Sequence, residues 1–222
     1  MALKLDLHIH THYSSDSWLS LKALINNIKS KGLSGVAVTD HNTMRGAFKL
    51  KNLNPPFKLI LAEEVKSKSG DIIGYFLQKE IPRGLCAEET IKRIKDQGGL
   101  VAIPHPFDLL RGCRMKIEKL HQIIDQVDLI EVRNSRTLWP GATLRSIKFA
   151  QEHNKPQIAG SDCHSRFELG QAFTEIEDFK DSQDFLIKAR QAKIHLRSHY
   201  PFWLYPLSGL AKLKHYIWPV KN

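Results

Sequence analysis

The chain has 222 residues and a formal net charge of +10, with 42% hydrophobic and 25% charged residues. This length and balance are ordinary for one globular domain and exclude a disordered, fibrous or disulfide-built protein. The excess of lysine and arginine indicates either an anionic partner or a solvated basic surface. Three cysteines without a CxxC pair give no disulfide framework and are typical of a reducing compartment.

No segment of the sequence resembles a targeting or membrane element. The first residues, from Met1 to His8, are interrupted by charged side chains and do not form a signal peptide. No apolar stretch is long enough to cross a bilayer. We therefore expect a cytoplasmic protein without a membrane span.

The first half of the chain alternates short apolar runs with segments of helical spacing. Gly32 and the pair Pro55-Pro56 end the two helical segments, and Ser69-Gly70-Asp71 looks like the turn of a hairpin. In chain order, the predicted elements are a strand over 3–9, a helix over 19–31, a strand over 35–39, a helix over 43–53, a strand over 58–62 and a hairpin over 65–76.

The second half continues the alternation. Its predicted elements are a helix over 87–97, a strand over 100–103, a helix over 115–126, a strand over 128–132, a helix over 141–153, strands over 157–159 and 172–176, and a helix over 181–192. The tail over 199–222 is aromatic and basic. Its side chains could stack on bases or contact a membrane face, but packing on the barrel or on a second copy is more common. We expect one domain over 1–222 with this tail packed on it.

Six or seven short apolar strands that alternate with helices indicate an α/β fold with a parallel sheet. An open doubly wound sheet and a closed barrel fit this pattern equally well. No GxGxxG segment follows the first strand and no P-loop occurs, which argues against a nucleotide-binding sheet.

Candidate metal ligands follow nearly every predicted strand. They are His8, His10 and His12, Asp40 and His41, Glu63 and Glu64, His105, Glu131, and Asp162 with His164. In a parallel α/β fold the carboxyl ends of the strands face one way, so these residues would converge. Residues i and i+2 of a strand share a face, so His8 and His10 could hold one metal, and Asp162 and His164 could do the same. Imidazole and carboxylate ligands suit Zn, Mn or Fe.

Four segments carry most of these residues: DLHIHT at 6–11, VTDHN at 38–42, VAIPHPF at 101–107 and GSDCH at 160–164. In this order they resemble the motifs of the PHP domain, the polymerase and histidinol phosphatase superfamily of metal-dependent phosphoesterases. The resemblance extends to about Gly170. It implies a distorted (β/α)7 TIM-like barrel with two or three divalent metal ions at its C-terminal mouth.

The resemblance also implies a set of metal ligands: His8, His10, Asp16, His41, Glu64, His105, Asp162 and His164. Two of them have an alternative. Asp16 lies in a Ser-Asp-Ser stretch that is also an ordinary helix cap, and Glu63 competes with Glu64 by one register step. The chain departs from the family at Asp71, where many members have a histidine, and at Glu131 and Asn134. Asp71 could be a ligand or a turn residue of the hairpin, and we expect the turn.

The implied activity is hydrolysis of phosphate esters by a metal-bound water. Asp40 is expected to orient that water or a metal ligand. Arg133, Asn134 and Arg136 follow the fifth strand and are the expected substrate-binding residues, because arginine binds phosphate bidentately. Weaker candidates follow other strands, namely Arg111, Arg114 and Arg166.

The expected substrates are phosphorylated small molecules such as nucleotides, or short nucleic acids. The alternative is a nucleic-acid-binding accessory module with a PHP metal site and little hydrolytic activity. The complete ligand set and the absence of a polymerase region in this sequence favour the enzyme.

Overall fold

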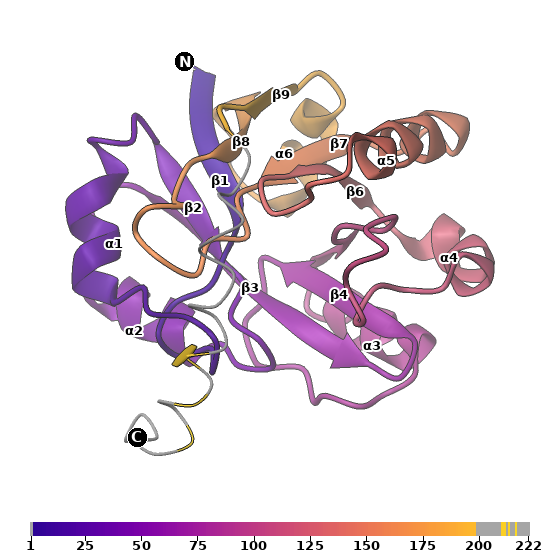
Figure 1. Ribbon diagram of the computed structural model, residues 1–222, viewed down its shortest axis with the longest axis horizontal. Coiled ribbons are helices and arrows are strands. Elements are labelled where there is room, and N and C mark those ends of the chain that lie inside the picture. The colour runs from indigo at the N-terminus through magenta and orange to yellow at the C-terminus, as the bar shows by residue number, and fades with distance from the viewer. Residues whose placement is uncertain (1, 199–209, 212, 214–215, 217–222) are drawn as a thin grey trace.

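The computed structural model describes residues 2–198, 210–211, 213 and 216 of the chain (Figure 1). The strands are β1 (Ala2–Ile9), β2 (Gly35–Val38), β3 (Lys58–Ser67), β4 (Gly70–Tyr75), β5 (Leu100–Ile103), β6 (Leu129–Asn134), β7 (Gln157–Gly160), β8 (Ala172–Glu177) and β9 (Lys193–Leu196). The helices are α1 (Leu21–Ile28), α2 (Arg45–Asn52), α3 (Ala87–Lys95), α4 (Ile117–Ile123), the short 3-10 helix η1 (Ile124–Gln126), α5 (Pro140–Glu152) and α6 (Ser182–Ala189).

One curved sheet contains all the strands of this described part, in the order β7-β6-β5-β4-β3-β2-β1-β8-β9. The segment after β7 meets β1: the N–H of Asp162 donates to the carbonyl of His8 at 2.7 Å, and the N–H of His10 donates to the carbonyl of Cys163 at 2.9 Å. Gly160 allows this approach, because a Cβ there would lie 2.3 Å from the Cβ of His8. The sheet is thus a nearly closed barrel with α1 and α2 outside one side and α3, α4 and α5 outside the other (Figure 1). The predicted α/β barrel class is confirmed.

The barrel has more strands and more antiparallel pairs than the sequence predicted. β4 runs antiparallel to both of its neighbours, and β8 runs antiparallel to β1 and β9. β3 continues through Glu63 and Glu64 to Ser67, so it forms the first strand of the predicted hairpin, and the turn itself is Lys68-Ser69. β9 was missed because its four residues adjoin the helix that was expected to reach Ala192.

The interior of the barrel is apolar below the mouth. One core cluster draws residues from eight of the strands, among them Leu5, Ala37, Ile60, Ile73 and Leu129. On β2 and β5, the residues next to these inner ones face outward. They belong to two other clusters, which contain residues of the outer helices. Alternation therefore separates one inner core from the layers under the helices.

The outer helices begin and end where local chemistry allows. In α1, the Ser20 hydroxyl accepts a hydrogen bond from the Ala23 N–H, which caps the helix. Leu21, Leu24 and Ile28 form its buried face, as the helical spacing predicted. The predicted positions of α2 to α6 also agree with the structure, within a few residues at their ends.

A bulge in β1 raises the two histidines of the first motif into the mouth of the barrel. β1 has one more residue between Asp6 and Ile9 than the matching stretch of β2. An extra residue reverses the inside–outside alternation of a strand. Leu7 therefore lies in the inner core, while His8 and His10 face the cavity above it.

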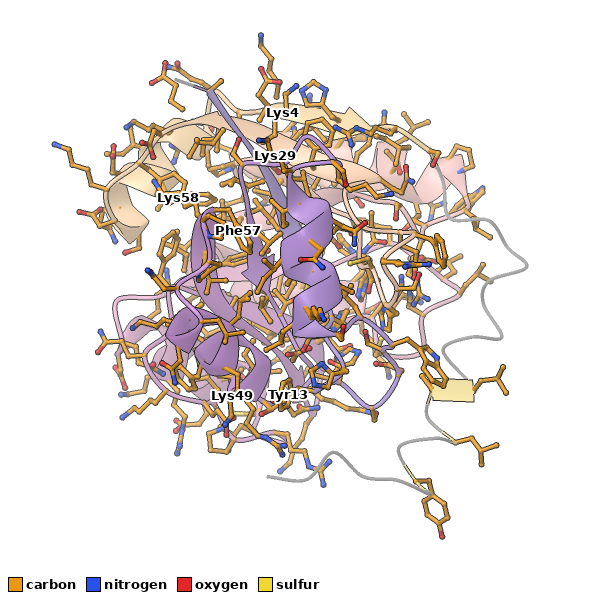
Figure 2. The ribbon with its side chains drawn as sticks, turned by 90° about the vertical axis from the view of Figure 1, so that its left-hand side faces the viewer. Lys4, Tyr13, Lys29, Lys49, Phe57 and Lys58 are labelled. Atoms are coloured by element: carbon orange, nitrogen blue, oxygen red, sulfur yellow. The ribbon has the colours of Figure 1, made fainter. Side chains whose placement is uncertain are left out.

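Positive charge is spread over the outer surface. Lys4, Lys29, Lys49 and Lys58 all lie on the side of the molecule formed by α1, α2 and the neighbouring strands (Figure 2). Within the residues described, no helix has both the length and the apolarity that a bilayer span requires. The expected packing of the tail over 199–222 lies largely outside the described residues, so the single-domain boundary stays a prediction.

Candidate metal centre

The side chains of the four motifs meet at the mouth of the barrel. They are almost completely buried, except for the half-buried His41. Together with Asp71 and Cys113 they form three groups, and the donor atoms within each group lie within 4.8 Å of one another. The groups are His8, His10 and Asp162; His10, His41 and His164; and Asp71, His105 and Cys113. The structure thus brings together all eight residues that the resemblance implied, with Asp16 and Glu64 bridging between the groups.

The first group combines two imidazoles and a carboxylate. The Nε2 atoms of His8 and His10 are 3.1 Å apart, as expected for residues i and i+2 on one face. Asp162 Oδ1 lies 3.3 Å from the Nε2 of His10 and 3.8 Å from that of His8. Glu64 Oε2 is 3.3 Å from both imidazoles. Four donor side chains therefore surround one small volume.

The second group shares His10 and extends toward Asp16. The Nδ1 atom of His41 lies 3.0 Å from Glu64 Oε2, and its Nε2 lies 3.5 Å from Asp16 Oδ2. The Nε2 atom of His164 lies 3.4 Å from Asp16 Oδ1. Asp16 therefore lies between two imidazoles, while the cap of the next helix, α1, is Ser20.

The third group contains Asp71, and the expectation that Asp71 is a turn residue is wrong. Asp71 follows the turn, lies inside β4 and is only 4% exposed. Because β4 is antiparallel to β3, the amino end of β4 reaches the same rim as the Glu64 carboxylate. His105 connects this group to the first one, since its Nε2 atom lies 3.3 Å from Glu64 Oε1.

Two candidate ligands have backbones in the left-handed region, with φ of +32° at His105 and +54° at Asp162. Such angles are uncommon for residues other than glycine and cost of order 1–3 kcal/mol, so the surrounding structure must hold them. Asp162 lies in the first group and His164 in the second, although Asp162 Oδ1 is 3.6 Å from the Nδ1 of His164. The i, i+2 rule does not apply here, because both residues lie beyond the end of β7.

Glu131, Asn134 and Asp40 hold the ligands in position. Glu131 Oε1 lies 2.9 Å from the Nδ1 of His8, and Glu131 Oε2 accepts the N–H of His105 at 2.8 Å. Asn134 donates to Glu131 and Asp162 at 3.0 and 3.2 Å. The amide of this expected substrate-binding residue is thus engaged with two carboxylates of the centre.

Asp40 reaches the centre through Ser14. The Ser14 hydroxyl donates to Asp40 Oδ1 at 3.1 Å and lies 3.2 Å from the Nδ1 of His10. Thr11 donates to Asp40 through both its N–H and its hydroxyl, at 2.6 and 2.7 Å. Asp40 is therefore placed to orient His10 through one hydroxyl group.

Three arginines line the cavity of the centre, Arg83, Arg111 and Arg136, and the cavity has a volume of about 430 Å³. The guanidinium of Arg111 lies 2.5 Å from Asp162 Oδ2. Arg136 pairs with Glu168 at 2.9 Å and is buried. Arg133 is half-buried and is not among the described residues that line this cavity. Arg111, a weaker candidate in the sequence, thus contacts a candidate metal ligand.

The electrostatics of the centre favour bound cations. Burial of His8 would lower its pKa, but the carboxylates of Glu131, Asp162 and Glu64 outweigh that cost and raise the pKa well above its usual range. Burial opposes ionisation of Glu64, yet His41 and His8 hold its pKa well below the usual range. Burial and the nearby Arg136 lower the pKa of His164 to about 4, so its imidazole is neutral.

The donor set fits divalent metal ions. Glu64 Oε1 and the Nδ1 atom of His105 are buried and accept or donate no hydrogen bond among the described residues. Divalent cations at these positions would supply the positive charge that His8 and His41 otherwise carry, and would leave the imidazoles in their neutral, ligating form. The oxygen and nitrogen donors suit Mn, Zn or Fe.

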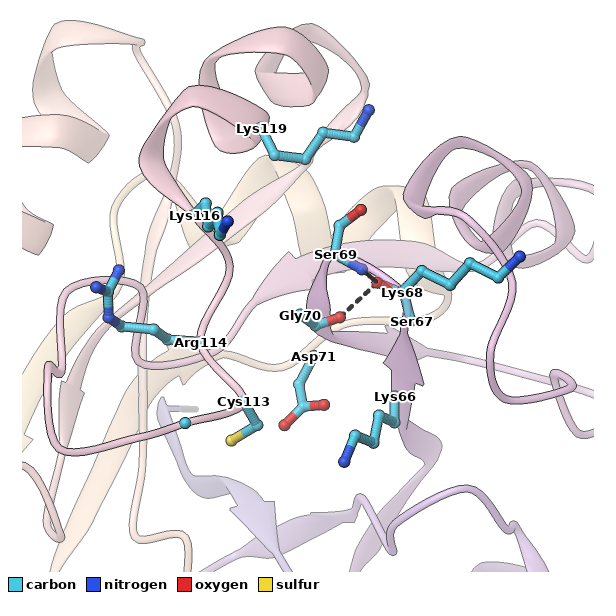
Figure 3. Close-up of a pocket in the computed structure, with 11 residues that line it drawn as sticks. Lys66, Ser67, Lys68, Ser69, Gly70, Asp71, Cys113, Arg114, Lys116 and Lys119 are labelled. Carbon is cyan, nitrogen blue, oxygen red and sulfur yellow. Dashed lines mark hydrogen bonds between the residues drawn. The ribbon is translucent and has the colours of Figure 1, made fainter.

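Two residues of this site, Glu131 and Arg111, already stand among the sequence candidates, Glu131 as a metal ligand and Arg111 as a weaker substrate-binding residue. Cys113 was missed and Asp71 was expected in a turn, because their positions depend on an antiparallel strand and on the loop before α4 (Figure 3).

Comparisons with known proteins agree with this geometry. The model of a family described as PHP-associated matches residues 140–194. An uncharacterized protein of Methanocaldococcus jannaschii is 38% identical over 145 residues, which cover 60% of this chain and 82% of that protein. A second uncharacterized protein of the same organism is 33% identical over 179 residues, which cover 79% of this chain and 71% of that protein.

A solved structure shares the fold. It is a two-domain protein from Bacteroides vulgatus that contains a predicted PHP-like metal-dependent phosphoesterase. The TM-score is 0.72 at 18% identity, over 88% of this chain. The chain spans 65% of the length of that protein.

Proposed function

We propose that the chain is a metal-dependent phosphoesterase of the PHP superfamily, as its PHP-associated family match and its PHP-like structural neighbour support. The observation that carries this proposal is the convergence of five imidazoles and three carboxylates at one rim of the barrel. The residues that would hold the metals are His8, His10, Asp16, His41, Glu64, His105, Asp162 and His164. Two or three divalent ions of Mn, Zn or Fe bound there would polarise the phosphoryl group and activate the attacking water.

The arginines of the cavity bind and orient the phosphoryl group. Arg136 lies at the cavity wall, and its pairing with Glu168 fixes the direction of the guanidinium. Arg111 is held between Asp162 and Asp108, at 2.5 and 3.6 Å. A planar guanidinium that is already oriented loses little freedom when it binds a phosphate.

The network around the ligands keeps them in one geometry. Glu131 fixes the ring of His8 through Nδ1, and Asp40 fixes His10 through Ser14. Partners of this kind orient the imidazole and raise its basicity as a ligand. The buried carboxylates therefore have two tasks, binding cations and aligning the side chains that bind them.

Nucleotides and short oligonucleotides are the substrates we favour. The cavity is lined by cationic and anionic side chains together, including Lys66, Arg83, Arg111 and Arg136. Such a lining suits the negative charge of a phosphate ester next to bound cations. The alternative is a nucleic-acid-binding accessory module in which the same centre has little hydrolytic activity.

Hydrolysis assays distinguish these two functions. The protein would be stripped with a chelator, reloaded with Mn²⁺, Zn²⁺ or Fe²⁺, and assayed for phosphate release from nucleotide monoesters and for cleavage of a chromogenic phosphodiester. We expect turnover that requires metal and is lost in His105→Ala but kept in His121→Ala, whose histidine is exposed on α4. Full metal occupancy without turnover on either substrate class would favour the accessory module.

A further inference from the structure

Glu168 is a buried acidic residue next to the metal centre. It lies in the loop between β7 and β8 and is only 3% exposed (Figure 1). Its Oε1 atom accepts a hydrogen bond from the Nε of Arg136 at 2.9 Å. Its Oε2 atom accepts from the backbone N–H of His164 at 3.1 Å and from the Ser165 hydroxyl at 2.7 Å. One carboxylate therefore connects an arginine of the cavity with a candidate metal ligand.

The backbone of His164 is held on both of its peptide groups. Its N–H donates to Glu168, and its carbonyl accepts from the Ser17 hydroxyl at 3.1 Å and from the N–H of Trp18 at 2.8 Å. Because His164 lies in a loop, these hydrogen bonds replace those that a strand or helix would supply. Glu168 is the charged side chain among these partners.

Arg136 is anchored through its backbone as well as its side chain. Its N–H donates to Asn134 Oδ1 at 3.0 Å, and the amide of Asn134 donates to Asp162 at 3.2 Å. Arg136 is 5% exposed and lines the cavity of the metal centre together with His164. A fixed cationic side chain therefore shares this cavity with an imidazole that would hold a metal ion.

Arg136 and a cation at His164 repel each other. After burial, the positive charge of Arg136 is the main cause of the low pKa of about 4 at His164. The same field opposes a divalent cation at this imidazole, and it is poorly screened because the groups are buried.

The carboxylates near His164 differ in what they can do about this repulsion. Asp16 and Asp162 lie 3.4 and 3.6 Å from the His164 ring, but both are candidate ligands whose charge acts on the metal itself. Within the described part of the chain, Glu168 is the carboxylate that pairs with the guanidinium of Arg136. Its negative charge is therefore the one placed to offset that of the arginine.

We propose that Glu168 offsets the charge of Arg136 beside the metal that His164 would hold, so that a phosphate-binding arginine and a metal cation share one cavity. This inference rests on the proposed function, in which both groups act on the same phosphoryl group. Glu168 is a positioning residue, because it acts through Arg136 and His164. Loss of its charge should have opposite effects on cation binding and anion binding.

Glu168→Gln tests the inference by binding, since it keeps the shape of the side chain and removes its charge. Metal-free protein would be titrated with Mn²⁺, with the free ion followed by electron paramagnetic resonance. We expect one bound equivalent to weaken by about tenfold and the others to stay unchanged. The affinity of metal-free protein for inorganic phosphate, measured by calorimetry, should rise about threefold, because the guanidinium is no longer neutralised. Burial raises the pKa of Glu168, so both titrations are made at pH 8.

Substitution of the arginine separates the effect of charge from that of shape. Glu168→Gln/Arg136→Gln carries neither charge, so its weakened Mn²⁺ equivalent should recover to within about threefold of the wild type. Arg136→Gln alone should bind Mn²⁺ at least as tightly as the wild type and phosphate more weakly. Glu152→Gln, on the exposed surface of α5, is the matched control and should leave both affinities unchanged.

Three results would overturn the inference. The first is an unchanged Mn²⁺ affinity in Glu168→Gln. The second is a loss of phosphate affinity in parallel with the loss of Mn²⁺ affinity, as a purely structural role would produce. The third is a double variant that binds Mn²⁺ as weakly as Glu168→Gln, which would assign the effect to the hydrogen bonds of His164. If Glu168→Gln does not fold, weaker Mn²⁺ binding by Arg136→Gln overturns the inference and tighter binding supports it.

Turnover assays separate this inference from the proposed function. The metal-loaded wild type, Glu168→Gln and Glu152→Gln would be compared by kcat/KM on a nucleotide monoester and on a chromogenic phosphodiester. Absence of turnover by the wild type on both substrates overturns the proposed function, while the Mn²⁺ and phosphate affinities still decide the role of Glu168. Turnover by the wild type together with an unchanged Mn²⁺ affinity in Glu168→Gln overturns the inference and leaves the function intact.

Discussion

Two adjacent glutamates, Glu63 and Glu64, lie on opposite faces of β3 and have different hydrogen-bond and charge partners. Glu64 faces the barrel mouth, where its carboxylate lies 3.0–3.3 Å from nitrogens of His8, His10, His41 and His105. Glu63 faces away from the metal centre and is equally buried. Its Oε2 atom accepts one hydrogen bond from the N–H of Ile81, and its Oε1 atom has no hydrogen-bond partner among the described residues.

Burial raises the pKa of both carboxyl groups, so the partners of each decide the outcome. The imidazoles around Glu64 overcome the cost of burial and hold its pKa well below the usual range. Around Glu63 burial dominates, with added repulsion from Glu80, and raises the pKa to about 8. A buried carboxylate is thus informative about function only together with its partners.

The largest effect on activity should come from a substitution of Asp162, which lies in the metal centre. Asp162→Ala removes a carboxylate that lies near both His8 and His10 and leaves Arg111 without its closest partner. We expect metal-dependent hydrolysis to fall about 10³-fold or more, with loss of bound metal measured by plasma mass spectrometry. Asp162→Asn, which keeps the shape, distinguishes this from misfolding. Full activity in Asp162→Asn would contradict the role of the carboxylate.

A smaller effect, on metal affinity, is expected from a substitution of Glu131, which positions the imidazole of His8. Glu131→Ala removes the partner of the His8 Nδ1 and should weaken metal affinity by about 10- to 100-fold. Glu131→Gln keeps an acceptor oxygen and should recover part of the affinity. Titration of the stripped protein with Mn²⁺ measures both variants. If the alanine variant bound Mn²⁺ as tightly as the wild type, the positioning role would be wrong.

Much of the metal centre could be predicted, because it depends on rules that act locally. His8, His41 and His105 end strands or follow them, and the carboxyl ends of parallel strands gather at one rim. The choice between Glu63 and Glu64 could not be made from local rules, because it depends on where the third strand ends. The sequence pattern ends the third strand at residue 62, while the structure extends it to Ser67, and only that extension places Glu64 on the inner face.

The parts that could not be predicted depend on long-range geometry. Asp71 reaches the rim because β4 reverses direction, and Arg111 reaches Asp162 from the loop after β5. Asp162 and His164 fall in different groups, although their spacing predicted a shared one, because both lie beyond the end of β7. A cavity between the β3–β4 hairpin and the loop before α4 likewise unites segments more than forty residues apart, a proximity that hydrophobic periodicity does not encode (Figure 3).

The smallest effect, on stability alone, should come from Glu63. Its pKa is raised from 4.5 to about 8 in the folded chain, so between these values the folded state holds a proton that the unfolded state has released. Stability therefore falls as pH rises through this window, and the contribution present below about pH 4.5 is lost above pH 8. Glu63→Gln, which carries no charge, should be more stable than the wild type by ~1–3 kcal/mol at pH 9 and little changed at pH 5.

Urea unfolding at both pH values measures this, with Glu118→Gln on exposed α4 surface as the control. Because the metal ligands titrate alike in the wild type and in both variants, their contribution cancels in the difference. An equal gain at pH 5 and pH 9 would place the stabilisation in packing rather than in the charge, and the two faces of β3 would then differ less than their partners indicate.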